Sequence, residues 1–408
     1  MIQKYTCQNG VRIVLEQIPH VRSAAIGIWV GVGSRDETPE NNGISHFLEH
    51  MFFKGTKTRN AREIAEAFDS IGGQVNAFTS KEYTCYYAKT LDNHASYALD
   101  ILQDMFFHST FDPDELNKEK NVVIEEIKMY EDAPDDTVHD LLSEAVYDQH
   151  ALGYPILGTE KTINQFNQEQ LNQYVEDMYT PDKIVISVAG NVEESIIKEI
   201  EQYFGSFVRE KNNHQSLVPT FHPEKRFKQK DTEQAHLCLG FNGLPAGHDH
   251  VYDLIVMNNI FGGSMSSRLF QEVREEKGLA YSVYSFHSSY RDSGLVTIYG
   301  GTGVEQLDAL YETIHSTLNT LKADGVTEKE LNNSKEQLKG NLMLGLESTN
   351  SRMSRNGRNE LLLGTHRSLD EIVKEIDAVN IERTNHMIQS VFSTEYSTAV
   401  ISPENLKA

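Results

Sequence analysis

Several features that other classes of protein need are scarce in this chain of 408 residues. It has only three cysteines, Cys7, Cys85 and Cys238, and because they are widely spaced and odd in number they favour a reducing compartment over a disulfide framework. No run approaches the roughly 20 apolar residues that a membrane-spanning helix requires. The first residues alternate between polar and apolar side chains and lack the continuous apolar core of a secretory signal. These absences predict a cytoplasmic protein.

Basic side chains are also outnumbered. The chain has 37 Lys and Arg residues against 60 Asp and Glu residues, which gives a formal net charge of −23. Nucleic acids and anionic membrane surfaces are bound by clustered Lys and Arg, so we expect neither as a partner. The acidity can serve solubility alone, and it also suits cationic ligands.

The composition is otherwise that of a folded globular protein, with 39% hydrophobic and 24% charged residues. A chain of this length is expected to form two domains. A polar stretch that contains prolines, residues 213–230, is predicted as the linker between a first domain at 1–212 and a second at 231–408.

Hydrophobic periodicity predicts both strands and helices in the first domain. Strands are expected at about 11–16, 23–32 and 183–190, with two more in the segment GGQVNAFTSKEYTCYYAKTL. Helices are expected at about 44–55, 60–71 and 94–108, and from Pro113 with Asp112 as its N-cap. The segment GSRDETPENNG, which precedes the first helix, is predicted as a polar loop.

After the linker the pattern begins again. The segment AHLCLGFNGLPAGHDHVYDLIVMNNIFGGSMSSRLFQEV has the same order of strand, polar loop, buried helix, glycine and helix as residues 24–64. Phe53, Gly55 and Thr56 fall on Phe261, Gly263 and Ser264 when the two segments are aligned. We therefore predict an α+β protein of two homologous halves, each a mixed or antiparallel β-sheet packed with helices.

The stretch HFLEH, residues 46–50, places ionisable groups among apolar side chains. Such groups are costly to bury unless they are paired, hydrogen-bonded or bound to a metal. His46 and His50 are four residues apart, so on a helix they share one face and can both reach one ion. Glu49 is placed to hold a water, as the general base of the inverted zincin pattern. The second half has Leu254, Met257 and Asn258 at the matching positions.

A third ligand is expected, because a catalytic zinc takes three protein ligands and keeps one position open. On the helix predicted from Pro113, Glu119 and Glu126 are seven residues apart and lie on nearly the same face. Glu125 points about 100° away from that face. We predict Glu126 as the ligand and Glu119 as the group that orients a ligand or a water from behind.

Together these motifs resemble the pitrilysin/insulinase family of zinc metallopeptidases, in the branch that includes mitochondrial processing peptidase and its bacterial relatives. The resemblance covers most of the chain and rests on HFLEH, EKNVVIEEI, GGQVNAFTSKEYT and SSRLFQEVREEKGLAYSVYS. It implies one zinc ion per chain, bound by His46, His50 and Glu126. It also implies that Glu49 is the catalytic base and that Glu119 assists.

The resemblance assigns residues that spacing alone leaves open. Arg274 and Tyr281 correspond to the family's Arg–Tyr pair, which contacts the substrate near the scissile carbonyl. From the sequence alone, Arg274 is one more charge on a solvated helix. Asn76 and Ala77 correspond to the family's edge strand, which binds an extended peptide through its backbone, although a routine paired strand would have the same sequence.

Relatives of this length are similar to half a clamshell and work as dimers around a chamber. The resemblance therefore implies a homodimer whose sites join the zinc of one subunit to Arg274 and Tyr281 of the other. The expected function is that of a zinc metalloendopeptidase acting on unfolded peptides, including basic ones, or on presequence-like segments. Two alternatives stay open: a non-catalytic scaffold or partner subunit of a peptidase complex, and a metal-storing or metal-sensing protein, which would have no use for Glu49.

Overall fold

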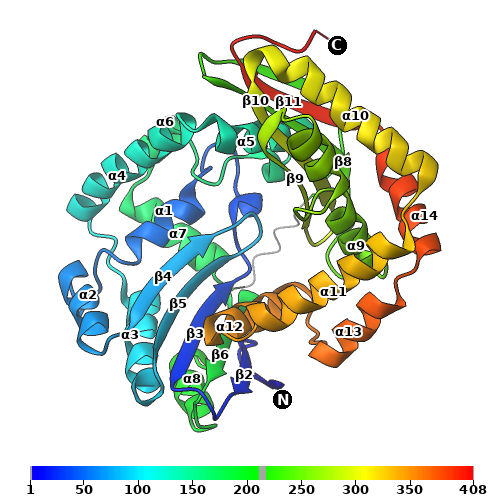
Figure 1. The fold of residues 1–408 in the computed structure, drawn as a ribbon. Coiled ribbons are helices and arrows are strands. Elements are labelled where there is room, and N and C mark those ends of the chain that lie inside the picture. The colour runs from blue at the N-terminus through cyan, green and yellow to red at the C-terminus, as the bar shows by residue number, and fades with distance from the viewer. Residues whose placement is uncertain (1, 211–216, 408) are drawn as a thin grey trace. The chain divides into compact units, whose positions relative to one another are not determined.

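A computed structural model describes residues 2–210 and 217–407 of the chain (Figure 1). The described residues form two compact units, each with one β-sheet. Unit 1 contains residues 2–128, 154–210 and 345–366. Unit 2 contains residues 129–153, 217–344 and 367–407. Each unit therefore includes segments from both halves of the sequence.

Unit 1 is built on a six-stranded mixed sheet in the order β1-β2-β6-β3-β5-β4. β2 and β6 run parallel, and all other neighbouring strands run antiparallel. Every residue of β6 is buried, as expected for a central strand that is covered on both faces. The strands are β1 Ile2–Thr6, β2 Arg12–Gln17, β3 Ser23–Val30, β4 Gln74–Thr79, β5 Thr84–Leu91 and β6 Ile184–Gly190.

Helices cover the two faces of this sheet. The main hydrophobic core includes Phe47, Leu48 and Met51 of the first helix, while the opposite face packs Trp29 against Met353. The indole nitrogen of Trp29 lies 3.3 Å from the sulfur of Met353. The helices are α1 Ile44–Met51, α2 Ala61–Ser70, α3 Ala95–His108, α4 Pro113–Glu131, α6 Glu160–Gln165, α7 Gln168–Met178, α8 Ile196–Phe204 and α12 Thr349–Leu362.

Unit 2 has a five-stranded sheet in the order β7-β11-β8-β10-β9. β7 and β11 run parallel, and the other pairs run antiparallel. The strands are β7 Lys225–Gln229, β8 Gln234–Asn242, β9 Ala280–Ser289, β10 Gly294–Gly303 and β11 Tyr396–Ser402. The helices are α5 Pro134–Tyr147, α9 Val251–Phe261, the π-helical η5 Phe270–Glu276, α10 Leu307–Asp324, α11 Glu328–Gly345, α13 Leu369–Ala378 and α14 Ile381–Phe392.

The two units repeat one plan. The order β3, α1, α2, β4, β5 and α3 in unit 1 corresponds to β8, α9, η5, β9, β10 and α10 in unit 2. In both units the strand that follows the helices lies at the edge of the sheet. The prediction of an α+β protein with two homologous halves is confirmed.

The compact units differ from the predicted division at 1–212 and 231–408. α5, from the first half of the sequence, packs against β8 and β11 of unit 2, and α12, from the second half, packs against β3 and β6 of unit 1. Periodicity shows that a helix has an apolar face but does not show which sheet that face will cover.

The predicted linker, residues 213–230, is also only partly a linker. Residues 213–216 lie outside the described part of the chain, and β7 within the remainder pairs with β11. Four of the five residues of β7 are exposed and none is buried, which is why this short strand, rich in Lys and Arg, has the sequence of a polar connection. Among the described residues, no helix is both long enough and apolar enough to span a membrane.

Candidate metal centre

The predicted metal-binding motif lies on α1, and a buried loop fixes the start of this helix. Gly43 precedes α1 with a φ of 93°, a left-handed conformation that glycine adopts without a steric penalty. The carboxylate of Glu37 accepts hydrogen bonds from the backbone nitrogens of Gly43 and Ser45, at 2.8 and 2.9 Å. A carboxylate at a helix N-terminus satisfies free N–H groups and complements the helix dipole.

α4 supplies the carboxylates of the site. Asp112 caps this helix as predicted, since its Oδ1 accepts from the backbone nitrogens of Asp114 and Glu115 at 2.9 and 3.2 Å. Glu119 is buried, and Glu126 is two turns further along the same face.

His46, His50 and Glu126 converge on one point. One possible ligand atom from each lies within 4.8 Å of the others, and no second group of this kind occurs in the described ranges 2–210 and 217–407. His46 Nε2 is 3.8 Å from Glu126 Oε1, and His50 Nε2 is 3.4 Å from Glu126 Oε2. The structure thus brings together the three residues predicted as ligands.

Glu119 lies behind His50. Its Oε1 is 2.7 Å from His50 Nδ1, and its Oε2 is 2.6 Å from the ammonium nitrogen of Lys54. A carboxylate on Nδ1 holds a proton there, so Nε2 is the ring nitrogen that would give up its proton to bind an ion. Lys54 compensates the charge of a carboxylate that would otherwise be buried beside the site.

The electrostatics of this group favour a bound cation. Burial lowers the pKa of His50, but the contacts with Glu119 and Glu126 outweigh burial and raise the pKa to about 9. Burial and the neighbouring His50 lower the pKa of His46 to about 4. The hydrogen bond with His50 lowers the pKa of Glu126. The carboxylates therefore stabilise positive charge at a point where a divalent cation could supply it.

The donor set suits zinc. Two imidazole nitrogens and one carboxylate are ligands that zinc prefers, and three protein ligands are what catalytic zinc sites provide. Both histidines turn Nε2 towards Glu126. Nδ1 of His46 is buried without a hydrogen-bond partner among the described residues, so this ring has no competing polar contact that fixes it away from an ion.

Glu49 stands outside the group of three and contacts β4. The hydroxyl of Thr79 donates a hydrogen bond to Glu49 Oε2, with 2.5 Å between the oxygens. Burial raises the pKa of Glu49, and the Thr79 hydrogen bond partly opposes that rise. A raised pKa brings a carboxylate closer to the pH at which it both accepts and returns a proton efficiently.

β4 presents one free edge. Within the part of the chain that the structure describes, it is the last strand of its sheet and pairs only with β5. Asn76 and Ala77, the predicted peptide-binding residues, lie on it, and Asn76 Oδ1 accepts a hydrogen bond from the backbone nitrogen of Ala77 at 2.8 Å. An unpaired edge is the feature that lets an extended peptide add to a sheet.

Arg274 and Tyr281 come together within unit 2. The guanidinium carbon of Arg274 is 4.8 Å from the ring centroid of Phe270 and 4.6 Å from that of Tyr281, so the group lies against two aromatic faces. Arg274 belongs to the π-helical turn η5, an arrangement common at functional sites. The side chain of Tyr281 is 79% exposed.

Comparisons with known proteins agree with this geometry. Residues 12–160 match the model of the insulinase family, peptidase family M16, and residues 165–338 match the model of the peptidase M16 inactive domain. Over 403 residues, 99% of this chain and 98% of the relative, the sequence is 69% identical to a Bacillus subtilis protein named uncharacterized zinc protease YmxG. This chain belongs to peptidase family M16.

More distant M16 proteins share the whole length. A Mycobacterium leprae protein named as an uncharacterized zinc protease is 39% identical over 406 residues, 98% of this chain and 91% of the relative. The crystal structure of a peptidase M16 inactive domain from Pseudomonas fluorescens has the same fold, with a TM-score of 0.92 and 18% identity over 100% of this chain and 99% of that one. The predicted family and the prediction of an enzyme, a peptidase, are confirmed.

Sequence reasoning missed the residues that support the M16 motif from other elements. The predicted polar loop before α1 is buried at residues 33–37 and 42–43, and Arg35 within it forms a 2.6 Å ion pair with Glu82. The charged residues before the motif were the only feature of the sequence that could have indicated these supporting contacts. The missed supporting residues are Glu37, Lys54 and Thr79.

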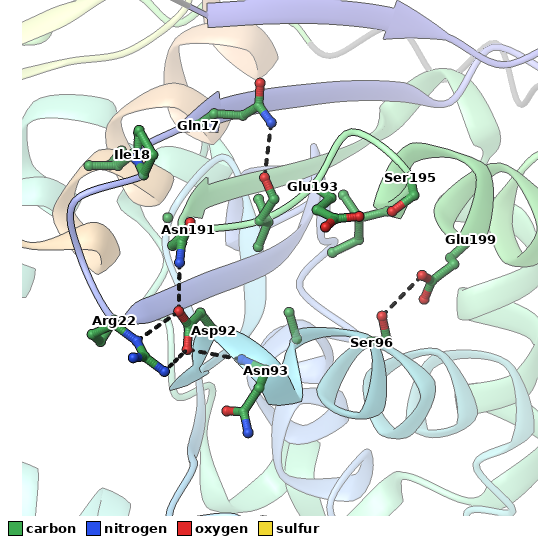
Figure 2. A pocket seen from close by; sticks show the side chains of 15 residues that line it. Gln17, Ile18, Arg22, Asp92, Asn93, Ser96, Asn191, Glu193, Ser195 and Glu199 are labelled. Atoms are coloured by element: carbon green, nitrogen blue, oxygen red, sulfur yellow. Dashed lines mark hydrogen bonds and ion pairs between the residues drawn. The ribbon is translucent and has the colours of Figure 1, made fainter.

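A separate pocket of unit 1 offers no rival chemistry. It has a volume of about 630 Å³ and lies where β2 and β6 end (Figure 2). Two of its carboxylates are engaged by other residues of the pocket, since Asp92 accepts hydrogen bonds from Arg22 and Asn191, and Glu199 accepts one from Ser96. None of its described residues belongs to the group that could hold a metal ion.

Proposed function

We propose that this M16 protein is a zinc-dependent metalloendopeptidase that hydrolyses unfolded peptides or presequence-like segments. The observation that carries the proposal is the convergence of His46, His50 and Glu126 on one point, with Glu49 left outside the group. A metal-storing protein needs the three ligands but not the fourth side chain. A non-catalytic scaffold needs neither.

The residues around the centre have distinct tasks. Bound zinc would lower the pKa of a water and act as a Lewis acid. Glu49 accepts the proton of the attacking water and returns it to the leaving amine. Glu119 holds His50 in the tautomer that turns Nε2 forward. Arg274 and Tyr281 donate hydrogen bonds to the oxygen of the scissile carbonyl as negative charge develops on it.

The proposed substrate is an extended chain. Pairing with the free edge of β4 at Asn76 and Ala77 requires a peptide backbone that is not already engaged in structure. The net charge of −23 favours peptides with basic residues. Folded proteins would therefore be poor substrates. A cytoplasmic location is proposed with this function, in line with three buried cysteines that are all free.

The test of the catalytic role is replacement of Glu49 by glutamine. E49Q should lower kcat for a quenched fluorescent peptide by about 10²- to 10⁴-fold, the usual contribution of a general base, because the amide cannot accept the proton. Zinc content should stay the same, since Glu49 is not a ligand. E125Q, which alters an exposed carboxylate beside the ligand Glu126, is the matched control. Near-normal turnover by E49Q would refute the role.

The proposed assembly is a homodimer that encloses a chamber with two sites. Each site would join the metal centre of one subunit to Arg274 and Tyr281 of the other. Mixing inactive E49Q with inactive Y281F should then restore activity, up to about a quarter of all sites if subunits exchange at random. Size-exclusion chromatography with light scattering gives the oligomeric state. If a mixture that does exchange subunits recovers no activity, each site is complete within one chain.

A further inference from the structure

The strand with the free edge also contacts the proposed catalytic base. Thr79 is the last residue of β4, two positions after Ala77. Its hydroxyl is 2.5 Å from Glu49 Oε2. Among the described residues, no other side chain donates a hydrogen bond to this carboxylate. One hydroxyl therefore connects β4 to Glu49.

The other polar groups around Glu49 do not hold it. Cys85 and Tyr86 are buried on β5, and each has a pKa raised by burial, with the charge of Glu49 contributing. The hydroxyl of Tyr86 pairs with that of Tyr179 at 3.1 Å. Among the described residues, neither group donates a hydrogen bond to Glu49, so the rotamer of Glu49 depends on Thr79.

We propose that Thr79 is a positioning residue for catalysis, which rests on the function proposed above. Its hydroxyl holds Glu49 Oε2 and leaves Oε1 as the atom that accepts the proton of the attacking water. A glutamate side chain has several accessible rotamers, and a base that is misplaced by about 1 Å can cost roughly 10²-fold in rate. Fixing one oxygen removes that freedom.

The same contact links substrate binding to catalysis. The Thr79 hydroxyl is carried by the backbone of β4, whose free edge at Asn76 and Ala77 is the proposed docking site. A peptide that pairs with this strand restrains the backbone that holds Glu49. Binding of an extended substrate would thus order the catalytic base in the same step.

Three threonine substitutions test this inference. T79V removes the hydroxyl with little change of shape, T79S keeps the hydroxyl, and T90V is the matched control. Thr90 lies on β5 of the same sheet and its hydroxyl donates only to the backbone oxygen of Leu91 among the described residues. T79V should lower kcat by about 10- to 100-fold, the value of a hydrogen bond to a charged group. KM and zinc content should stay within about twofold of wild type, because the ligands and the strand edge are intact.

Rescue by serine separates positioning from packing. T79S should retain kcat within about threefold of wild type, and T90V should be unchanged. A T79V protein with wild-type kcat, or a T79S protein as impaired as T79V, would overturn the inference. A crystal structure of T79V gives a second readout: Glu49 should leave the rotamer that faces β4, and an unmoved Glu49 would contradict the proposed role.

The variant E49Q in the same assay distinguishes this inference from the proposed function. If E49Q keeps its activity, the proposed function fails. If E49Q is inactive while T79V matches wild type, only the role of Thr79 fails. Because Thr79 acts through Glu49, the double variant T79V/E49Q should be no slower than E49Q. A further drop in the double variant would show that Thr79 acts elsewhere.

Discussion

The 2.7 Å contact between His50 Nδ1 and Glu119 Oε1 decides which nitrogen of His50 faces Glu126. The same carboxylate binds Lys54 through its other oxygen at 2.6 Å. These contacts lower the pKa of Glu119 despite its burial, so it remains an acceptor. In the proposed function, Glu119 therefore acts on the metal centre through His50.

Replacement of Glu119 by glutamine tests this chain of contacts. E119Q should weaken zinc affinity by about 10- to 100-fold, the usual effect of losing a carboxylate behind a ligand histidine. The measurement is competition with a chelator of known affinity. E126Q should abolish tight binding, because it removes a ligand.

The control on the same helix is E125Q, whose carboxylate is exposed and pairs only with Lys128 among the described residues. It should leave zinc affinity unchanged. Wild-type zinc affinity in both E119Q and E125Q would contradict the role of Glu119. An equal loss of affinity in both variants would point to a general effect of charge on α4.

At the scale of single residues, the sequence predicts which side chains share a helix face. His46 with His50, and Glu119 with Glu126, follow from the helical period alone. Thr79 does not, because its contact with Glu49 spans 30 residues and depends on how β4 packs beside α1. Contacts between elements that are distant in sequence have no periodic signal.

The element that matters most is α1, which is only eight residues long. So short a helix has little stability of its own and depends on tertiary contacts. Glu37 supplies them at the N-terminus through Gly43 and Ser45, and its Oε2 also accepts from the side-chain amide of Asn42 at 2.9 Å. The buried part of this loop therefore supports the proposed metal centre.

We predict that E37A destabilises the protein by about 2 kcal/mol, because it leaves buried N–H groups without an acceptor. The proposed metal ligand His46, one residue after Ser45, should lose its fixed position, so zinc affinity should fall as well. Denaturant unfolding and chelator competition measure the two effects. E40A changes an exposed glutamate of the same loop and should alter stability by less than about 0.5 kcal/mol. An E37A protein as stable as E40A would contradict the capping role.

The bounds of most elements of unit 1 follow from periodicity and caps. The predicted helix at 60–71 is α2 Ala61–Ser70, and the strand predicted at 183–190 is β6 Ile184–Gly190. The helix predicted at 44–55 ends earlier, at Met51. Gly55 adopts a φ of 124° in the turn that follows, and an apolar run such as this one gives no signal for where the helix stops.

At the scale of the whole molecule, two helices decide how the sequence halves form compact units. α5 covers part of the sheet of unit 2, and α12 covers part of the sheet of unit 1. The duplication was visible in the sequence because both halves repeat one order of elements. The sequence did not show that α5 and α12 each pack on the sheet of the other half, because both helices have ordinary amphipathic patterns that fit either sheet.

Two histidines that bear on acid stability lie where α5 packs on the sheet of unit 2, His139 on α5 and His236 on β8. His139 Nδ1 is 3.6 Å from the sulfur of Cys238, and its Nε2 is 3.4 Å from the hydroxyl of Tyr284. Burial lowers the pKa of His139 and of His236, although Asp135 on α5 opposes both shifts. Unfolded histidine titrates near 6.5, so below about that pH the unfolded chain binds protons that the folded chain does not. Stability is then lost as the pH falls.

We predict that the urea midpoint decreases between about pH 7 and pH 5, and that H139Q makes the decrease smaller. H20Q, which alters an exposed histidine, is the control and should keep the wild-type pH dependence. An H139Q protein with the same pH dependence as wild type would show that His139 does not contribute.

The central claim is that one metal ion is bound by His46, His50 and Glu126 and is needed for peptide hydrolysis. The most direct measurement is the zinc content of the purified wild-type protein, followed by chelation and stoichiometric zinc return in a peptide-cleavage assay. We predict one tightly bound zinc per chain, loss of cleavage on chelation and recovery with one equivalent of zinc. Protein that carries no tightly bound transition metal, or that keeps cleaving peptides after complete metal removal, would contradict the account.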